Sequence, residues 1–264
     1  MVESTSTILH ILEHMEVGGI RTKLLHMLKE YPNPDVHHAI LTFDGASGLT
    51  DEFNALNNVS LRCVPETAEW SVLGSAFRIL NISNAVKEHA PSILHSWHMS
   101  TNMDLLPVAP FLGNTPILLS IDCPSVVADN KSPLTSIRLK ALSALSLADN
   151  VHIHSISPRT TDELVKAGTR KDAVIELGNG VDVDHFRPIP DAKRDVCREF
   201  GLSENSIIIG GAGRHSKADP SKDIPNVLYA AAVLKQKNPV LYEKCVFMVC
   251  GKGTADGELH EISR

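Results

Sequence analysis

One stretch of the sequence combines glycines with fixed cations in a way that suits phosphate chemistry. An apolar run at 207–209 opens into Gly210 and Gly211, and Arg214 and Lys222 follow. Glycines let backbone N–H groups approach a ligand closely, and two fixed cations neutralise a diphosphate. We therefore predict that Arg214 and Lys222 bind a diphosphate and neutralise its charge, with no divalent metal required. The alternative is a pair of solvated surface side chains.

A second glycine pair, Gly18-Gly19, lies between an apolar run at 7–12 and a helical pattern at 22–28. A strand, a glycine loop and a helix make a phosphate-binding geometry, because the helix N-terminus offers free N–H groups and partial positive charge. The alternative is a plain βα turn. The loop is not G-x-G-x-x-G, so a nicotinamide dinucleotide is not specially indicated.

Two further candidates directly follow predicted strands. His98 comes after the strand at 92–97, and Asp122 comes after the strand at 116–121. Trp97 and His98 could stack on a sugar or hydrogen-bond to it; the alternative is a packed tryptophan and a histidine satisfied within the protein. In parallel sheets, ligands lie beyond the carboxyl ends of the strands, so residues at these positions are expected near the ligand.

The remaining histidines and the cysteines indicate no metal site. His152 and His154 lie on one strand face and His37 adjoins His38, but a third ligand at zinc spacing is missing. The five cysteines are scattered, odd in number and without a C-x-x-C pair. We expect buried free thiols in a reducing compartment.

Strands and helices alternate along most of the sequence. Strands are predicted at 7–12, 38–43, 59–64, 92–97, 116–121, 150–156 and 171–177, and helices at 22–28, 49–56, 70–89, 104–112, 132–148 and 157–168. This alternation predicts an α/β fold with a parallel, doubly wound sheet and right-handed crossovers.

The sequence Gly178-Asn179-Gly180 predicts a sharp turn that ends this first domain, because both residue types tolerate positive φ. Beyond it we expect helices at 191–200 and 225–237 and strands at 206–209 and 245–250. Two strands cannot bury both faces of a Rossmann-like sheet. We therefore expect domains at 1–180 and 181–264, the second of them incomplete because of a C-terminal truncation.

Composition is that of an ordinary globular protein. Of the 264 residues 43% are hydrophobic, and the net charge of −6 gives no general attraction to nucleic acid or anionic lipid. No run approaches the roughly 20 apolar residues that cross a bilayer, and the N-terminus lacks a signal-sequence pattern. We expect a cytoplasmic protein.

The protein resembles the GT-B glycosyltransferases of family 4, in their inter-domain hinge and donor-phosphate loop. The matching residues are Asn179-Gly180-Val181-Asp182, Phe186, Pro188, Gly213-Arg214 and Lys222-Asp223. The spacing from Arg214 to Lys222 is longer than usual in the family, so Lys217 is a rival for the lysine role.

The resemblance implies a GT-B fold of two Rossmann-like domains and a retaining, metal-independent transfer. The donor would be a nucleoside-diphosphate sugar, UDP- or GDP-linked, without a further cofactor. The acceptor would be a polysaccharide or a lipid-linked sugar, with peripheral contact at the inner membrane face and no nucleic acid partner. Gly18 and Gly19 match the family's cleft loop, with Arg21 in place of its usual acidic residue; Asp122 replaces a histidine that contacts the donor sugar.

Two other functions stay open. The protein could be a catalytically inactive remnant or binding module of the same fold, which the predicted truncation and Asp122 both favour. It could also be a nicotinamide-dependent oxidoreductase, which the missing dinucleotide fingerprint disfavours.

Overall fold

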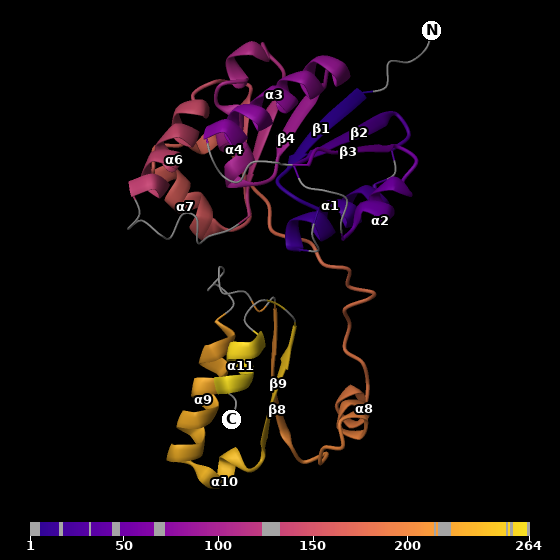
Figure 1. The fold of residues 1–264 in the computed structure, drawn as a ribbon, viewed down its shortest axis with the longest axis vertical. Coiled ribbons are helices and arrows are strands. Elements are labelled where there is room, and N and C mark those ends of the chain that lie inside the picture. The colour runs from indigo at the N-terminus through magenta and orange to yellow at the C-terminus, as the bar shows by residue number, and fades with distance from the viewer. Residues whose placement is uncertain are drawn as a thin grey trace. The chain divides into compact units, whose positions relative to one another are not determined.

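A computed structural model gives the fold in two compact units, Met1–Val181 and Asp182–Arg264 (Figure 1). The structure describes residues 6–15, 18–31, 33–43, 48–65, 72–122, 133–213, 215, 223–251, 253 and 256–262. Each unit contains a β-sheet of its own.

The first unit is built on a seven-stranded sheet in which every neighbouring pair is parallel, in the order β3-β2-β1-β4-β5-β6-β7. Its strands are β1 (Ser6–Leu12), β2 (Val36–Thr42), β3 (Val59–Cys63), β4 (Ile93–Ser96), β5 (Ile117–Ile121), β6 (Val151–Ser155) and β7 (Val174–Glu176). The predicted parallel sheet is therefore present. Strand order reverses between β1 and β4, which makes their carboxyl ends the topological switch point.

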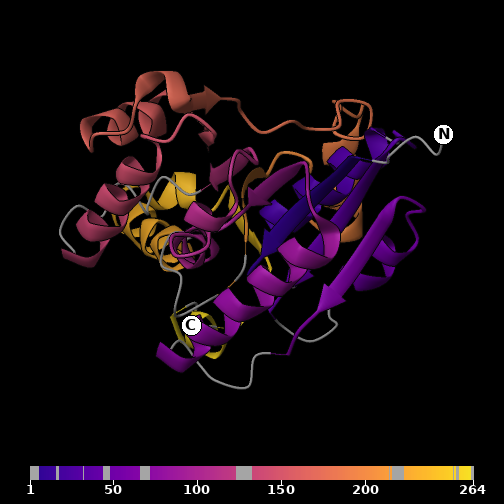
Figure 2. The same ribbon diagram turned by 90° about the horizontal axis from the view of Figure 1, so that it is seen from above.

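Helices connect these strands on both faces of the sheet. They are α1 (Gly19–Glu30), α2 (Thr50–Asn54), α3 (Val72–His89), α4 (Met99–Leu105), α6 (Pro133–Leu145) and α7 (Pro158–Lys166), with short 3₁₀ turns η1 (Ala109–Phe111) and η2 (Lys171–Ala173). The long helix α3 packs against β1 and β2 (Figure 2).

Alternation along β1 shows how the sequence fills the two faces. Leu9 and Ile11 join a core cluster with residues of α3, α4 and α6, whereas Leu12 joins a second cluster with Leu24 and Leu28 of α1. Successive strand residues point to opposite faces, so a continuous apolar run can serve both layers. The sheet is buried on both sides, as parallel sheets require.

Two local predictions in this unit are wrong. The helix predicted at 104–112 instead spans Met99–Leu105, and only the turn η1 follows, because Pro107 and Pro110 lack the N–H that would continue it. Residues 171–177 form η2 before a strand of only three residues. Gly168, which follows the end of α7, has a positive φ of +105°, as is common for a glycine at that position.

The Gly178-Asn179-Gly180 segment is not the predicted sharp turn. None of its residues has a positive φ, and no turn is formed there. The segment is held from outside instead: the Leu177 carbonyl oxygen accepts from His154 Nε2 at 2.9 Å, and Asn179 Oδ1 accepts from Lys23 Nζ at 3.2 Å. Tertiary contacts therefore set its path.

The second unit contains a two-stranded parallel sheet of β8 (Ile207–Ala212) and β9 (Cys245–Cys250). Its helices are α8 (Ala192–Glu199), α9 (Ile224–Lys237), α10 (Pro239–Tyr242) and α11 (Asp256–Ile262). Gly210 and Gly211, predicted as loop, continue β8 and pair with Met248 and Val249.

Two further features of the described residues are the state of the cysteines and the length and polarity of the helices. Cys63, Cys197, Cys245 and Cys250 are free, but only Cys197 is buried, and Cys123 lies outside the described residues. Across the described part of the protein, every helix is too short or too polar to span a membrane.

Candidate functional site

The candidate site lies at the carboxyl edge of the first unit's sheet, at the switch point. Glu13 and His14 follow β1, and Trp97 and His98 follow β4, the strand paired with β1. Asp122 follows β5, the next strand along. The structure therefore brings the two sequence-predicted residues, His98 and Asp122, to one edge of the sheet.

Helix α1 begins at this edge with an open N-terminus. Gly18 is its N-cap, without a side-chain cap, and the first turn carries no acidic residue. Arg21 and Lys23 lie in the first turns instead, where cations oppose the helix dipole. A helix N-terminus already favours an anion, and Arg21 adds positive charge to it, whereas the charge of Lys23 is balanced by Asp122.

Gly18 and Gly19 differ in what surrounds them, and therefore in the role that each can have in this loop. A Cβ on Gly18 would lie 2.7 Å from Arg21 Nη2, so Gly18 makes room for the buried guanidinium. Its φ of −178° is ordinary extended backbone. Gly19 is exposed, and nothing lies within 4 Å of where its Cβ would be. Of the pair, Gly19 is therefore the residue whose backbone is open to a ligand.

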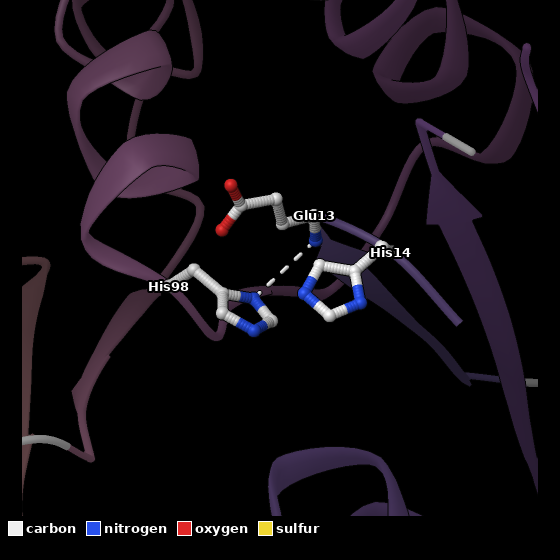
Figure 3. A group of neighbouring side chains, drawn as sticks. All are labelled: Glu13, His14 and His98. Atoms are coloured by element: carbon white, nitrogen blue, oxygen red, sulfur yellow. Dashed lines mark hydrogen bonds between the residues drawn. The ribbon is translucent and has the colours of Figure 1, made fainter. Parts of the chain in front are cut away.

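Two N–H groups face the ring of His98, which as a neutral imidazole can accept from only one of them. Arg21 Nη1 donates to His98 Nε2 at 3.0 Å, and the backbone N–H of Glu13 points at His98 Nδ1 from 3.3 Å (Figure 3). Burial, with Arg21 and His14 adding to it, lowers the pKa of His98 to about 3. The ring is neutral at physiological pH, so it is not poised for proton transfer there.

Glu13, His14 and His98 lie close enough to suggest a metal ion. One ligand atom from each lies within 4.8 Å of the others (Figure 3). However, N–H groups face both nitrogens of His98, and the Arg21 guanidinium is directly beside the ring. A divalent cation would have to displace that charge, so this group fits an anionic or polar ligand better than a metal.

Lys23 connects the ends of three strands. Its Nζ donates to Asp122 Oδ1 at 2.5 Å and to Asn179 Oδ1 at 3.2 Å, and lies 5.1 Å from the centre of the Trp97 ring. Trp97 is almost completely buried, which agrees with the alternative of a packed tryptophan and excludes stacking of a sugar on its ring. The Trp97 ring instead supports the partly exposed ammonium group of Lys23.

A layer of neutral histidines supports Trp97. The indole N–H donates to His10 Nδ1 at 3.2 Å, so the other nitrogen of His10 must donate to His38 Nδ1, at 3.0 Å. His95 stacks on the indole with ring centroids 4.0 Å apart. Burial lowers the pKa of His10 to about 3 and that of His95 well below its usual range.

A chain of hydrogen bonds continues from His95 across the sheet, with each group donating towards β7. The Leu177 carbonyl can only accept, so His154 Nε2 donates to it and His154 Nδ1 accepts from Ser120 Oγ at 3.0 Å. Ser120 Oγ in turn accepts from His95 Nε2 at 2.9 Å. His154, for which we predicted no metal role, thus anchors the end of β7.

The predicted cations of the second unit, Arg214 and Lys222, and the rival Lys217 lie outside the described residues. Around them, Gly213 donates its N–H to the Cys250 carbonyl at 3.0 Å. That N–H group is therefore unavailable to a phosphate. His215 donates from Nδ1 to Asp256 Oδ1 at 2.6 Å, which ties the segment after β8 to the first residue of α11.

Sequence reasoning missed Glu13, His14 and Lys23, and noted Arg21 only as a replacement. The sequence position of Lys23 could have indicated a role for it. A cation near a helix N-terminus is electrostatically unfavourable unless an anionic group or a ligand nearby compensates for it. Lys23 also lies four residues after Gly19, on the same helix face. The partners of Lys23, at 122 and 179, could not be read from the sequence.

Comparison with known proteins agrees with the fold. No family model matches the sequence. The protein is 23% identical over 269 residues to "Putative glycosyltransferase EpsF" of Bacillus subtilis (strain 168), covering 100% of this chain and 66% of that protein. The chain thus spans about two thirds of the relative's length.

Solved structures match over nearly the whole length of the protein. HepE of Anabaena, in complex with UDP-glucose, aligns with a TM-score of 0.70 at 16% identity, over 97% of this chain and 65% of that one. A glycosyltransferase of Rickettsia africae gives 0.62 at 15%, over 98% and 64%. A UDP-GlcNAc 2-epimerase of Neisseria meningitidis, bound to UDP-GlcNAc, gives 0.57 at 11%, over 97% and 68%. The predicted α/β fold of the GT-B type is confirmed.

Proposed function

We propose that this chain belongs to a family 4 glycosyltransferase that moves a sugar from a nucleoside-diphosphate donor to a polysaccharide or lipid-linked acceptor. The transfer would retain anomeric configuration and need no metal, and it would take place in the cytoplasm, with peripheral contact at the inner membrane face. The observation that carries the proposal is the open, cationic start of α1 at the switch point. Similarity to EpsF over the whole chain, and to HepE with UDP-glucose bound, supports the same ligand class.

Each unit, taken by itself, contains candidate residues for binding the diphosphate of the donor. In the first unit, the backbone at Gly19 would face the diphosphate, and the buried Arg21 guanidinium would attract it electrostatically. In the second, Arg214 and Lys222, or Lys217, would stabilise the leaving group, as their match to the family's motif suggests. His98 and Asp122 would lie near the sugar.

Titration calorimetry of this protein against UDP, GDP, ADP and NAD tests the donor. We expect saturable binding of one nucleoside diphosphate and none of NAD. Arg214→Ala should weaken that binding by roughly 1–3 kcal/mol, because it removes a charged hydrogen bond. Arg198→Ala is the matched control: this exposed arginine of α8 pairs only locally, with Asp195, among the described residues. Equal affinities for wild type and Arg214→Ala would remove Arg214 from the site.

A non-catalytic binding module is the second candidate, and one observation favours it. His98 has donors facing both nitrogens and a pKa far below neutrality, so it offers no general acid or base at physiological pH. A nucleotide sugar that binds saturably but is neither hydrolysed nor transferred to added saccharides would support this candidate.

A further inference from the structure

We propose that Lys23 and Asp122 together bind two neighbouring hydroxyl groups of the donor's sugar, an inference that rests on the proposed nucleotide-sugar donor. The pair lies at the carboxyl edge of the sheet, with Lys23 on α1 and Asp122 directly after β5. It combines a donor and an acceptor at one point.

Asp122 has an acceptor to spare. Its side chain is 7% exposed, one oxygen accepts from Lys23, and Oδ2 has no hydrogen-bond partner within the described residues. A buried carboxylate oxygen without a donor is costly, because it has lost water and gained nothing in exchange. A hydroxyl group of a ligand is the kind of donor that would satisfy it.

Lys23 has a donor to spare. An ammonium group carries three N–H donors, and two of them go to Asp122 Oδ1 and Asn179 Oδ1. The side chain is 22% exposed, unlike that of its partner, so the third donor can meet a ligand atom. The ammonium group also makes a cation–π contact with the indole ring of Trp97, which helps to hold it in place.

Charge decides which part of the ligand belongs here. Lys23 and Asp122 form an ion pair with no net charge, and a phosphate would be repelled by the carboxylate. A neutral group with adjacent hydroxyls can donate to Asp122 and accept from Lys23 at the same time. The pair therefore suits a sugar ring better than a diphosphate.

Spacing along α1 places the two parts of the ligand in order. Gly19, at the anion-binding start of the helix, and Lys23 are one turn apart on the same face, a rise of about 6 Å. In a nucleotide sugar the ring is bonded directly to the terminal phosphate. One molecule can thus put its phosphate at the helix start and its sugar hydroxyls at Lys23.

The supporting layer explains why the ammonium is held at this point. Two contacts hold the Trp97 ring: His10 accepts from its N–H, and His95 stacks on its face. Neutral rings below the cation avoid the repulsion that a protonated histidine would cause. His10 and His95 are therefore positioning residues for Lys23.

The test compares the affinity of the full chain for UDP with its affinity for UDP-glucose and UDP-GlcNAc. In wild type we expect at least one sugar nucleotide to bind more tightly than UDP. Lys23→Met should weaken that sugar nucleotide about tenfold while changing UDP less than about twofold, because only the hydroxyl contacts are lost. Lys29→Met, a change to an exposed lysine near the end of the same helix, should alter neither.

Asp122→Asn gives a second, nearly isosteric test if Lys23→Met proves unstable by thermal melting. It should show the same selective loss for the sugar nucleotide. An equal loss for UDP and the sugar nucleotides, or no loss for either, overturns the assignment and leaves the proposed function standing. If wild-type protein binds a nucleoside diphosphate but gains nothing from the sugar, only the subsite falls; if it binds none of UDP, GDP and ADP, the donor assignment falls as well.

Discussion

The two units treat the same kind of apolar strand differently. In β1 of the first unit, Leu9 and Ile11 are 1% and 0% exposed, whereas Ile207 and Ile209 in β8 of the second unit are 45% and 37% exposed. Both strands are rich in isoleucine or leucine. Hydrophobic sequence alone therefore does not determine burial; the number of neighbouring layers does.

The chemistry of the two units differs in the same sense. The first unit holds buried, neutral histidines behind a charged edge, which requires a sheet with both faces covered. In the second unit, tight backbone packing between two loops holds His215 against Asp256. The histidine layer of the first unit depends on a buried core, and the His215–Asp256 pair of the second unit depends on close contacts at glycines. Single substitutions in each unit can separate these two sources of stability.

Leu94→Ala should cause the largest loss. Leu94 lies fully buried in β4, between β1 and β5, so truncation leaves a cavity and should cost about 2–5 kcal/mol in free energy of unfolding. Hydrogen exchange should show the loss in peptides of the first unit. Leu80→Ala, on the exposed face of α3, is the control and should cost far less. Equal losses for both variants would mean that the first unit lacks a sealed core.

Acid should destabilise the first unit through His10. The pKa of its imidazole is about 3 in the folded protein, against an ordinary value of 6.5, so the unfolded state binds the proton first as pH falls. The stability is complete above pH 6.5 and is lost towards pH 3, by up to about 1.4 kcal/mol per pH unit.

Urea unfolding at several pH values between about 7 and 5, within the window set by the two pKa values, measures this slope. His10→Asn, which has no titrating ring, should flatten it by about one proton. The same slope in the variant would show that His10 does not titrate on unfolding.

Gly251→Ala should damage the second unit despite its thin core. Gly251 has φ +154°, and a Cβ there would overlap the Gly213 carbonyl oxygen, so we expect a loss of about 1–3 kcal/mol. Exchange should rise in the loops after β8 and β9. Gly257→Ala is the control, because nothing lies within 4 Å and alanine favours a helix. A neutral Gly251→Ala would show that these loops are not tightly packed.

Ile209→Ala should have the smallest effect. The side chain is already 37% exposed, so its removal uncovers little new surface and should cost less than about 1 kcal/mol. The informative measurement is its ratio to Leu94→Ala. A loss as large as that for Leu94 would mean that the exposed face of β8 is covered in solution.

Local signals predicted the elements well where one rule dominated. The apolar runs of β1, β2 and β9 and the glycine that ends α7 are each specified by neighbouring residues. Predictions failed where a distant residue decided the outcome. Asn179 and its glycines were predicted as a turn from their own flexibility, but contacts from Lys23 and His154 keep the segment out of a turn.

The alternating α/β architecture follows from the sequence alone, and so does the edge of the sheet at which His98 and Asp122 lie. Periodicity and turn residues act within a few positions, so they can be read without a fold. Only the tertiary structure paired Lys23 with Asp122, 99 residues away, and placed Arg21 against His98, 77 residues away. Such contacts depend on strand order in the sheet, and no local sequence pattern predicts which side chains meet there.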